Sequence, residues 1–594
     1  MKKLLTILIA IMMVFGLTAC GGGSSDSGNS DVAEEKILSV MFGGGTPLYM
    51  DPALNSASAG SNIIKLSHCG LMGFGPDGKL GPELAESYTV SDDNLTYVFT
   101  LRDGLKWSDG SDFKASDVVN AWKRAASDDL GADYGFLFGM FEGYGDGDIN
   151  VVADDDAKTI TVKMAYAAPY FLELCAFPVF FPVKTDIADA EGTWAINPET
   201  SIGMGAFKMV SYAADDVIVY EKNPYYWNAE NVKLDGVKAY LAEDNTAILT
   251  AYENDSVQFI NSVEPTEFDR LRETYGDEFF IADQMGTWYI LFNTYKDVSP
   301  LGKQLSIQDQ SKARFAFGQL INREEITEYV YVAGEAPATG FYPAGLSDGL
   351  NSDVRSCDLY GTWYTGTNTP STENAAYTVD QVEACKTLID LGYAYTGSIE
   401  GGDIKFTDVP NIEMSFNNSG ANALIMTYVQ DTWAKFGIPS TILQDAWSTL
   451  QVELKNGNAE CARMGWVADF NDCTNFIEIF ISASGNNYPR VGQDGGTYAK
   501  ASAVTADAGL GAYWGLDGNQ TWAEAYDALD NAILYSTDAQ ERAKLCAEAE
   551  KVIMATGAVA PIYFYTNPCM QKSNVTGINV LVSGDIICTY ADIQ

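Results

Sequence analysis

Two opposite charges that flank an apolar stretch are the residues best suited to do chemistry in this chain. Arg463 and Asp469 lie six positions apart and are separated by the sequence Met-Gly-Trp-Val-Ala. In a strand, six residues cover about 20 Å, and the even spacing places both charged side chains on the same face. Such a pair could hold the two ends of a zwitterionic ligand. The alternative is a pair of ordinary surface charges, which contribute little.

A single histidine, His68, restricts the enzymatic chemistry open to the chain. Serine and cysteine hydrolases with a His base, and zinc sites built on two or more His, need imidazole at the reaction centre. Most enzymes of those classes are therefore excluded. Hydrolysis by a pair of carboxylates stays open, because 80 acidic residues make some close pair inevitable, although no spacing motif selects one.

Aromatic residues form the second candidate feature. They are more numerous than one core layer needs, and sites for varied organic ligands are lined in this way. Core packing is the alternative for any one of them. The residues concerned are Tyr134, Phe136, Phe138, Tyr144, Trp433, Trp447, Trp466 and Phe470.

Short motifs for nucleotide and calcium binding fail on inspection. Residues 73–78 satisfy G-x-G-x-x-G, but Pro-Asp-Gly at 76–78 predicts a hairpin turn. Residues 146–150 begin like a calcium-binding loop, yet Val151 and Ala157 stand where Gly and a bidentate Glu are required. A solvated acidic loop is favoured there, with calcium as the alternative. We expect no cofactor and no metal.

The elements that must position these residues mix strands and helices. With 594 residues the chain is long enough for three to four domains, and 47% hydrophobic residues are ample for packed cores. Short strand-like runs at 96–101 and 159–162 alternate with turn clusters over the first 220 residues, and helices dominate later. Without a fixed repeat, this mixture indicates an α/β or α+β class.

Helices are expected in three segments of the second half. Over 422–436 the apolar residues recur at helical spacing, and Gly437 follows the last of them. Two more helices are expected over 521–534 and 539–554. The second is opened by Thr537, with a Gln three residues later at capping-box spacing.

The chain is strongly acidic. Thirty-six Lys and Arg residues stand against 80 Asp and Glu residues, which gives a net charge of −44. A surface of this sign repels phosphate backbones, and no run of Lys or Arg is present. We expect no nucleic-acid partner.

The N-terminal sequence is typical of an export signal. Two lysines precede the apolar run 4–15, which is too short to span a bilayer, and Leu-Thr-Ala-Cys follows at 17–20. That tetrapeptide resembles the bacterial lipobox, in which Cys20 is alkylated by diacylglycerol and becomes the mature N-terminus. Residues 21–31 match a flexible tether, and the folded body is expected to begin near Ile37. A buried hydrophobic helix with a chance Cys is the alternative.

Nine cysteines follow Cys20. They are odd in number and none is in a C-x-x-C spacing, so neither a full disulfide framework nor a zinc ribbon is indicated. We expect most of them to be small buried side chains. Their pairing is left open.

Eight segments in a fixed order resemble one family, the extracytoplasmic solute-binding proteins of peptide ABC importers and in particular the oligopeptide-binding proteins. The segments are DPAL at 51–54, GPELAESY at 81–88, LTYVFTLRDGLKWSDG at 95–110, EKNPYYW at 221–227, LFNT at 291–294, INRE at 321–324, GWVADFND at 465–472 and PIYFY at 561–565.

The resemblance implies an α/β fold of the two-lobed periplasmic-binding-protein type (type II, cluster C) with an additional domain. The two lobes close on the ligand about a hinge. The implied division is a lipoprotein signal peptide at 1–20, a tether at 21–36, lobe I at 37–68, 201–285 and 557–594, the extra domain at 69–200, and lobe II at 286–556.

The resemblance also implies roles for single residues. Asp469 matches a carboxylate that holds a peptide α-ammonium, and Arg463 matches a cation that meets the peptide carboxylate. Gly465 and Val467, with Ser56, Ala57 and Ser58 opposite, match segments that pair with the backbone of the peptide as added strands. Tyr134 matches an aromatic residue that covers the ligand, and Trp447 and Trp466 match walls of the side-chain pockets. Asn422 stands where related binders place a His that meets the carboxylate of longer peptides.

The expected function is a non-enzymatic receptor that captures short peptides and delivers them to the permease of an ABC importer and, through it, to the ATPase. We expect a monomer, held by its lipid on the outer face of the cytoplasmic membrane. Two alternatives stay open. One is another cargo of the same cluster, such as a nickel chelate, an oligosaccharide, an opine or a signalling peptide. The other is a secreted carboxylate hydrolase.

The lipobox interpretation predicts the outcome of Cys20→Ala. The variant should keep its fold but lose the lipid, because one modified thiol is the anchor that the sequence offers. Membrane fractionation checks this. A variant that sediments with membranes as the parent does would contradict the lipoprotein interpretation.

Overall fold

The computed structural model describes residues 35–168, 170–189, 191–332, 334–364, 369–418, 420–491 and 522–594. The predicted signal, Cys20 and nearly all of the tether lie outside these ranges. The folded unit runs from Lys36 to Gln594. Among the described residues, no helix is both long and apolar enough to cross a membrane.

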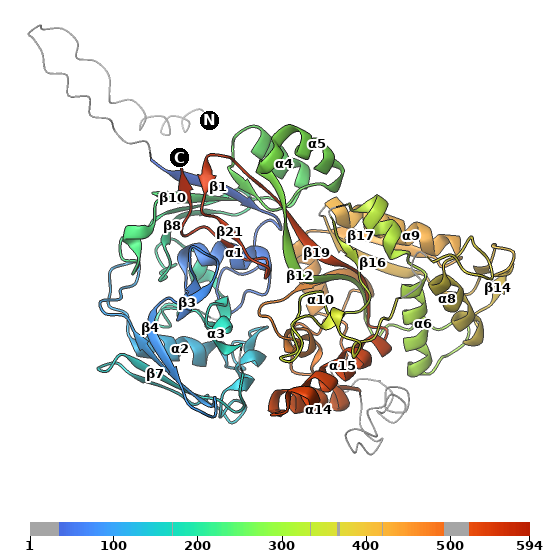
Figure 1. Ribbon diagram of the computed structural model, residues 1–594, viewed down its shortest axis with the longest axis horizontal. Coiled ribbons are helices and arrows are strands. Elements are labelled where there is room, and N and C mark those ends of the chain that lie inside the picture. The colour runs from blue at the N-terminus through green and yellow to red at the C-terminus, as the bar shows by residue number, and fades with distance from the viewer. Residues whose placement is uncertain are drawn as a thin grey trace, which may run out of the picture. The chain divides into compact units, whose positions relative to one another are not determined.

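An eleven-stranded sheet organises this unit (Figure 1). Its strand order is β17-β16-β18-β12-β19-β11-β1-β10-β9-β8, and β13 pairs with β19 outside this path. The strands are β1 Ile37–Phe42, β8 Phe207–Ala213, β9 Val217–Lys222, β10 Gly236–Leu241, β11 Phe259–Ile260, β12 Phe279–Phe292, β13 Ala336–Pro337, β16 Ile412–Asn417, β17 Ser440–Asp445, β18 Cys461–Val467 and β19 Val559–Gln571.

Two long antiparallel strands, β12 and β19, join the two sides of this sheet. Strands from residues 37–260 lie on one side of the pair, and strands from residues 412–467 lie on the other. The register runs from Phe279 opposite Met570 to Leu291 opposite Val559, and it shifts between Asp283 and Thr287. The connection between the two sides is therefore made of continuous backbone ladders.

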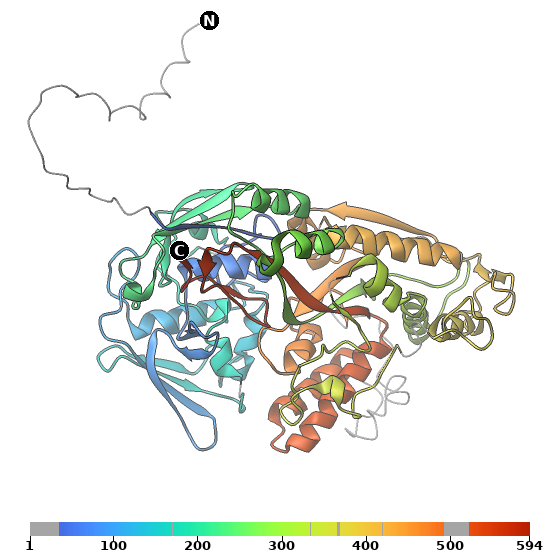
Figure 2. The ribbon, with the colours of Figure 1, turned by 45° about the horizontal axis from the view of Figure 1, so that its top comes forward.

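Helices pack on both halves of the sheet, that is, on the strands to either side of β12 and β19. On the first side are α1 Ser58–Ser67, α4 Asn245–Glu253 and α5 Phe268–Tyr275. On the second side, α9 packs against β16 and β17 (Figure 2). The helices there are α6 Ile307–Gln319, α7 Arg323–Glu325, α8 Val379–Asp390, α9 Gly420–Lys435, α10 Trp447–Lys455, α11 Thr474–Ile477, α14 Trp522–Tyr535 and α15 Ala539–Ala555.

A separate antiparallel sheet is formed within residues 85–163. Its order is β4-β5-β7-β6, and α2 (Ala115–Ala125) packs on β6 and β7. The strands are β4 Ala85–Val90, β5 Thr96–Leu101, β6 Val151–Asp154 and β7 Thr159–Lys163. The strands predicted at 96–101 and 159–162 are thus confirmed. The short helix α3 (Phe171–Leu174) follows this sheet.

Small hairpins and two-stranded sheets complete the described part of the chain. They pair β2 Met72–Phe74 with β3 Leu80–Pro82, β14 Tyr395–Thr396 with β15 Lys405–Phe406, β20 Val575–Thr576 with β23 Asp592–Ile593, and β21 Asn579–Val580 with β22 Ile586–Ile587. The turn between β2 and β3 carries the G-x-G-x-x-G sequence: the Gly75 N–H donates to the Lys79 carbonyl at 2.9 Å, and Gly78 has φ +71°. The predicted hairpin turn is confirmed.

One predicted cap is wrong. Helix α15 begins after Asp538, whose carboxylate accepts the N–H groups of Gln540 (2.8 Å) and Glu541 (3.2 Å), so Thr537 lies outside the helix. Both N–H groups donate to the same oxygen, Oδ1, and the negative charge of the carboxylate is favourable at the positive end of the helix dipole.

The structure pairs two cysteines that the sequence left open, Cys473 next to α11 and Cys546 in α15. Seven others are free, and most of these are buried, as expected: Cys69, Cys175, Cys357, Cys385, Cys461, Cys569 and Cys588. The disulfide ties α15 to the segment that follows the predicted ligand site.

Glu550 of α15 makes a buried network that we expect to dominate local stability. Its carboxylate accepts the N–H groups of Phe341 (2.8 Å) and Tyr342 (3.0 Å) and pairs with Arg355 at 2.6 Å. Glu550→Ala would leave the buried Arg355 guanidinium without its charge partner and two backbone N–H donors without an acceptor. It should lower the free energy of unfolding by about 3 to 5 kcal/mol. Urea denaturation measures the loss. Glu548→Ala in the same helix removes a more exposed ion pair and should cost less than about 1 kcal/mol; equal effects would contradict the argument.

Candidate ligand-binding cleft

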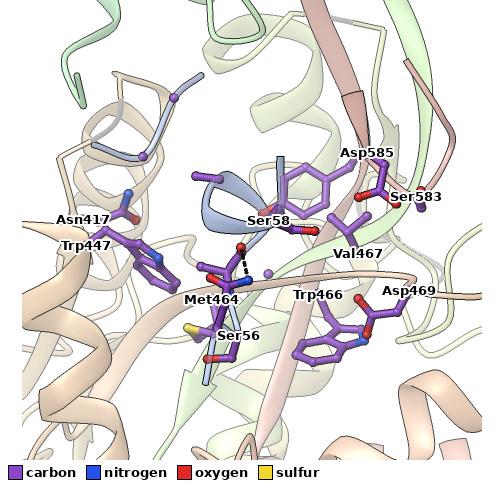
Figure 3. Close-up of a pocket in the computed structure, with 18 of the residues that line it drawn as sticks. Ser56, Ser58, Asn417, Trp447, Met464, Trp466, Val467, Asp469, Ser583 and Asp585 are labelled. Atoms are coloured by element: carbon purple, nitrogen blue, oxygen red, sulfur yellow. Dashed lines mark hydrogen bonds between the residues drawn. The ribbon is translucent and has the colours of Figure 1, made fainter. Parts of the chain in front are cut away.

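A cavity of about 270 Å³ lies where segments distant in sequence meet (Figure 3). The segment before and at the start of α1 forms one wall, and β18 forms the opposite wall. The lining includes ten of the eleven residues predicted to contact ligand: Ser56, Ala57, Ser58, Tyr134, Trp447, Arg463, Gly465, Trp466, Val467 and Asp469. Their joint placement is a consequence of the tertiary fold, because they come from four separate stretches of chain.

Strand β18 presents an open edge to this cavity. On one side, Cys461–Val467 pairs in full with β12. On the other side, β16 pairs only with Cys461 and Ala462. From Arg463 to Val467, the second edge of β18 therefore has no partner strand among the described residues. Alternate backbone N–H and C=O groups along this edge are available to an extended ligand.

Gly465 sits in the middle of the open edge for a steric reason. A Cβ atom at this position would lie 2.0 Å from the Tyr565 hydroxyl oxygen. That hydroxyl accepts a hydrogen bond from Arg463 Nη2 at 2.8 Å. The missing side chain lets Tyr565 cross β18 and reach the guanidinium, so Gly465 and Tyr565 together orient Arg463.

Carboxylates gather at one end of the cavity. In Figure 3, Asp469 and Asp585 lie on the side of Trp466, away from Trp447 and Asn417. Asp469 Oδ2 accepts hydrogen bonds from the Tyr134 hydroxyl (3.0 Å) and from Asn475 Nδ2 (3.2 Å). Asp585 is paired with Lys65. No described cation forms an ion pair with Asp469.

Burial sets the protonation of Asp469. Desolvation raises the pKa of its carboxyl to about 7, although the hydrogen bonds from Asn475 and Tyr134 act in the opposite direction. A cation entering this end of the cavity would supply the missing charge partner and favour the ionised form.

The cationic group lies at the other end. Arg463 Nη1 donates to Asn417 Oδ1 at 3.2 Å, and Asn417 lies beside Trp447 in Figure 3. Its Nε has no hydrogen-bond partner in the described structure, and no described carboxylate lies within 4.0 Å of the guanidinium. Arg463 is thus surrounded by neutral groups and keeps an uncompensated charge.

Contacts across the cavity hold its walls together. Asp133 accepts a hydrogen bond from the Ser56 hydroxyl at 2.7 Å and pairs with Lys455 of α10. The backbone N–H of Trp447 donates to Glu243 Oε1 at 3.1 Å. These contacts join four stretches of chain that are far apart in sequence, and they hold the walls of the cavity against one another.

Asn422 is the one predicted residue that does not line the cavity. It is buried in α9, where its Oδ1 accepts from Trp288 Nε1 at 3.0 Å and its Nδ2 donates to Asn417 Oδ1 at 3.1 Å. Packing of α9 on the sheet commits both amide groups to the protein. Asn422 therefore positions Asn417, which in turn holds Arg463.

Several lining residues were missed from the sequence. Tyr565 belongs to the PIYFY segment, which signalled family resemblance but no contact. Asp585, Ser583, Tyr488 and Asn417 carried no sequence signal. The described residues contain no group of three or more His, Cys, Asp or Glu residues arranged to hold a metal ion.

The model "Bacterial extracellular solute-binding proteins, family 5 Middle" matches residues 79–488. The chain belongs to this family. Its members are substrate-binding proteins, and the family agrees with the resemblance inferred from the eight segments.

Relatives cover almost the whole chain. The oligopeptide-binding protein OppA of Bacillus subtilis is 27% identical over 607 residues, covering 99% of this chain and 98% of its own. The dipeptide-binding protein DppE of the same organism is 26% identical, with 100% and 99% covered.

The solved structures confirm the fold of the family. Haemophilus influenzae OppA, in complex with the peptide RPPGFSPFR, matches with a TM-score of 0.76 at 22% identity, covering 94% of this chain and 99% of that one. The Escherichia coli murein tripeptide-binding protein MppA matches with the same values. The expected two-lobed α/β fold is thereby confirmed.

The raised pKa of Asp469 predicts a pH dependence of stability without ligand. Between about pH 4, the unfolded value, and pH 7, the folded state holds a proton that the unfolded state lacks. This carboxyl therefore stabilises the protein at low pH, and its contribution falls by up to about 1.4 kcal/mol per pH unit as the pH rises to 7.

Denaturation of parent and Asp469→Asn at pH 5 and 7.5 measures this contribution. The variant should lose less stability than the parent as the pH rises. Tyr134→Phe, which removes a donor to the carboxylate, should steepen the loss above pH 7. Parallel pH profiles for parent and Asp469→Asn would contradict the assigned burial.

Proposed function

We propose that this protein is a non-enzymatic extracytoplasmic receptor that captures short peptides between its two lobes and passes them to an ABC importer. The observation that carries the proposal is the open edge of β18 inside a cavity with Arg463 at one end and Asp469 at the other, neither of which forms an ion pair with a described residue. The names of the relatives support it, since OppA and DppE of Bacillus subtilis are described as oligopeptide-binding and dipeptide-binding proteins.

The edge of β18 supplies recognition that does not depend on side chains. A peptide lying along Arg463–Val467 would extend the sheet by one strand and satisfy the free N–H and C=O groups. The segment Ser56–Ser58 would bind its other side. This mode accepts many sequences, because every peptide has the same backbone.

The charged ends of the cavity would fix direction and length. The peptide α-ammonium would meet Asp469, and the α-carboxylate would meet Arg463. Each protein charge is partly buried and is held by neutral hydrogen-bonding groups, so a ligand of opposite charge recovers the cost of its desolvation. Tyr134 would cover the N-terminal end, and Trp466 and Trp447 would wall the side-chain pockets.

The remaining parts of the proposal concern the whole chain. Lobe I comprises residues 37–68, 201–285 and 557–594, lobe II comprises residues 286–556, and residues 69–200 form the extra domain. The protein acts as a monomer on the outer face of the cytoplasmic membrane, where the lipid on Cys20 holds it. Its partners are the permease and, through it, the ATPase of the importer.

Loss of the Asp469 carboxylate should be the most damaging single change to binding. Removing the partner of a desolvated ammonium costs about 2 to 5 kcal/mol, or roughly 30-fold to several-thousand-fold in affinity. Calorimetric titration of one peptide, free and N-acetylated, against parent and Asp469→Asn checks this. The parent should lose most of its affinity for the capped peptide, and the variant should discriminate much less.

Two controls separate this role from general damage. Arg463→Ala should weaken binding less, and by an amount that depends on peptide length. Mass spectrometry of the incubated peptide should find it intact, whereas cleaved product would indicate a hydrolase. Equal affinity of the parent for both forms of the peptide would overturn the role of Asp469.

A further inference from the structure

A second cavity of about 250 Å³ adjoins the proposed peptide site. The residues that line both cavities are Gly43, Gly44, Ser58, Ala59, Asn417, Val467 and Tyr565. Beyond these residues, the second cavity reaches the chain after β11 and the strands β12 and β19 that connect the lobes. We refer to it as the amide annex.

The lining of the amide annex is rich in carboxamides and poor in charge. It includes Asn245, Asn261, Gln284, Asn417, Asn418 and Asn567. Glu243 is the only carboxylate in the described lining, which contains no Lys, Arg or His. An anionic group of a ligand would find no opposite charge here.

The orientation of two amides follows from their partners. Asn261 Oδ1 accepts the Gly43 N–H at 3.0 Å, and Asn417 Oδ1 accepts from Arg463 at 3.2 Å. A backbone N–H and a guanidinium can only donate, so both amide oxygens face these donors. The NH₂ group of each side chain is then the part that can bond to a ligand.

These NH₂ groups lack partners in the described structure. Neither Asn261 Nδ2 nor Asn417 Nδ2 makes a hydrogen bond there, and the same holds for Nδ2 of Asn567, a residue that is only 6% exposed. These donors are therefore available to an acceptor on a ligand.

We propose that the amide annex binds the carboxamide side chain of a Gln or Asn residue in the captured peptide. The carboxamide oxygen has two lone pairs and would accept from the NH₂ groups of Asn261 and Asn567. Its own NH₂ would donate to the carboxylate of Glu243. A carboxamide thus matches both kinds of group in the lining, whereas a carboxylate side chain lacks the donor and an apolar side chain lacks both.

The inference rests on the proposed peptide-binding function and adds a preference to it. Its test uses tetra-alanine, the four peptides that carry Gln at one position each, and the matching sets with Met, Glu and Lys, titrated calorimetrically into the full protein. At one position, Gln should bind roughly tenfold more tightly than Met, the effect of one or two net hydrogen bonds. Glu and Lys at that position should bind more weakly than Gln.

Replacing Asn by Asp tests the contribution of the NH₂ donors in the amide annex. Asn261→Asp and Asn567→Asp keep the size of the side chain and an acceptor, but remove the NH₂ group. Each should reduce the Gln preference to less than about threefold and improve binding of the Lys peptide. Asn254→Asp, at the exposed C-terminal cap of α4, makes the same change in charge outside the cavity and should leave the preference unchanged.

The outcomes separate the two proposals. If tetra-alanine binds but Gln gives no advantage over Met at any position, the annex proposal fails and the peptide receptor stands. A Gln preference that survives both Asp variants, or Lys as the preferred side chain in the parent, also overturns the annex. If none of the peptides binds, the proposed function itself is wrong, and the annex proposal falls with it.

Discussion

The open edge of β18 is the constraint on which the rest of the site depends. Backbone N–H and C=O groups need hydrogen-bond partners when they are removed from water, and here the pairing of β16 with β18 ends at Ala462. The neighbouring residues are consistent with an edge kept free for a guest strand. Gly465 has no side chain to obstruct it, and Tyr565 fills the space behind it. The opposite wall is a short segment at the start of α1 rather than another strand.

Two charged side chains of the cavity, Asp469 and Arg463, are likewise left without an ion-pair partner among the described residues. Asp585, the other carboxylate at the Asp469 end of the cavity, is paired with Lys65. Asp469 is instead held by neutral donors, and Arg463 by neutral acceptors. A cavity with an unpaired cation at one end and an unpaired acid at the other suits a zwitterion, whose own charges complete the pairs. In the proposed mode of binding, backbone pairing sets the range of peptide sequences that are accepted, the two ends of the cavity set the direction of the peptide, and the amide annex adds a preference for one kind of side chain.

Much of the local structure could be predicted from the sequence. The strand at Thr96–Leu101 has the predicted bounds, and α9 differs by two residues at its start and one at its end. These elements follow from alternating or helical periodicity, which is a property of neighbouring residues. The cap of α15 was misassigned because Thr537 and Asp538 are adjacent and both can cap. Choosing between them depends on where the chain enters the helix, which packing decides.

The sequence by itself determined the family, through eight ordered segments, and the two charges that mark the ends of the cavity. Only the tertiary structure decided which side chains meet there. Tyr134 and Asp469 are 335 positions apart, and their hydrogen bond depends on contact between distant parts of the chain. The same packing turned Asn422 inward to serve Asn417, and brought Asp585 and the amides of the annex to the cavity. Burial and partner choice are long-range properties, so residue type and spacing alone do not specify them.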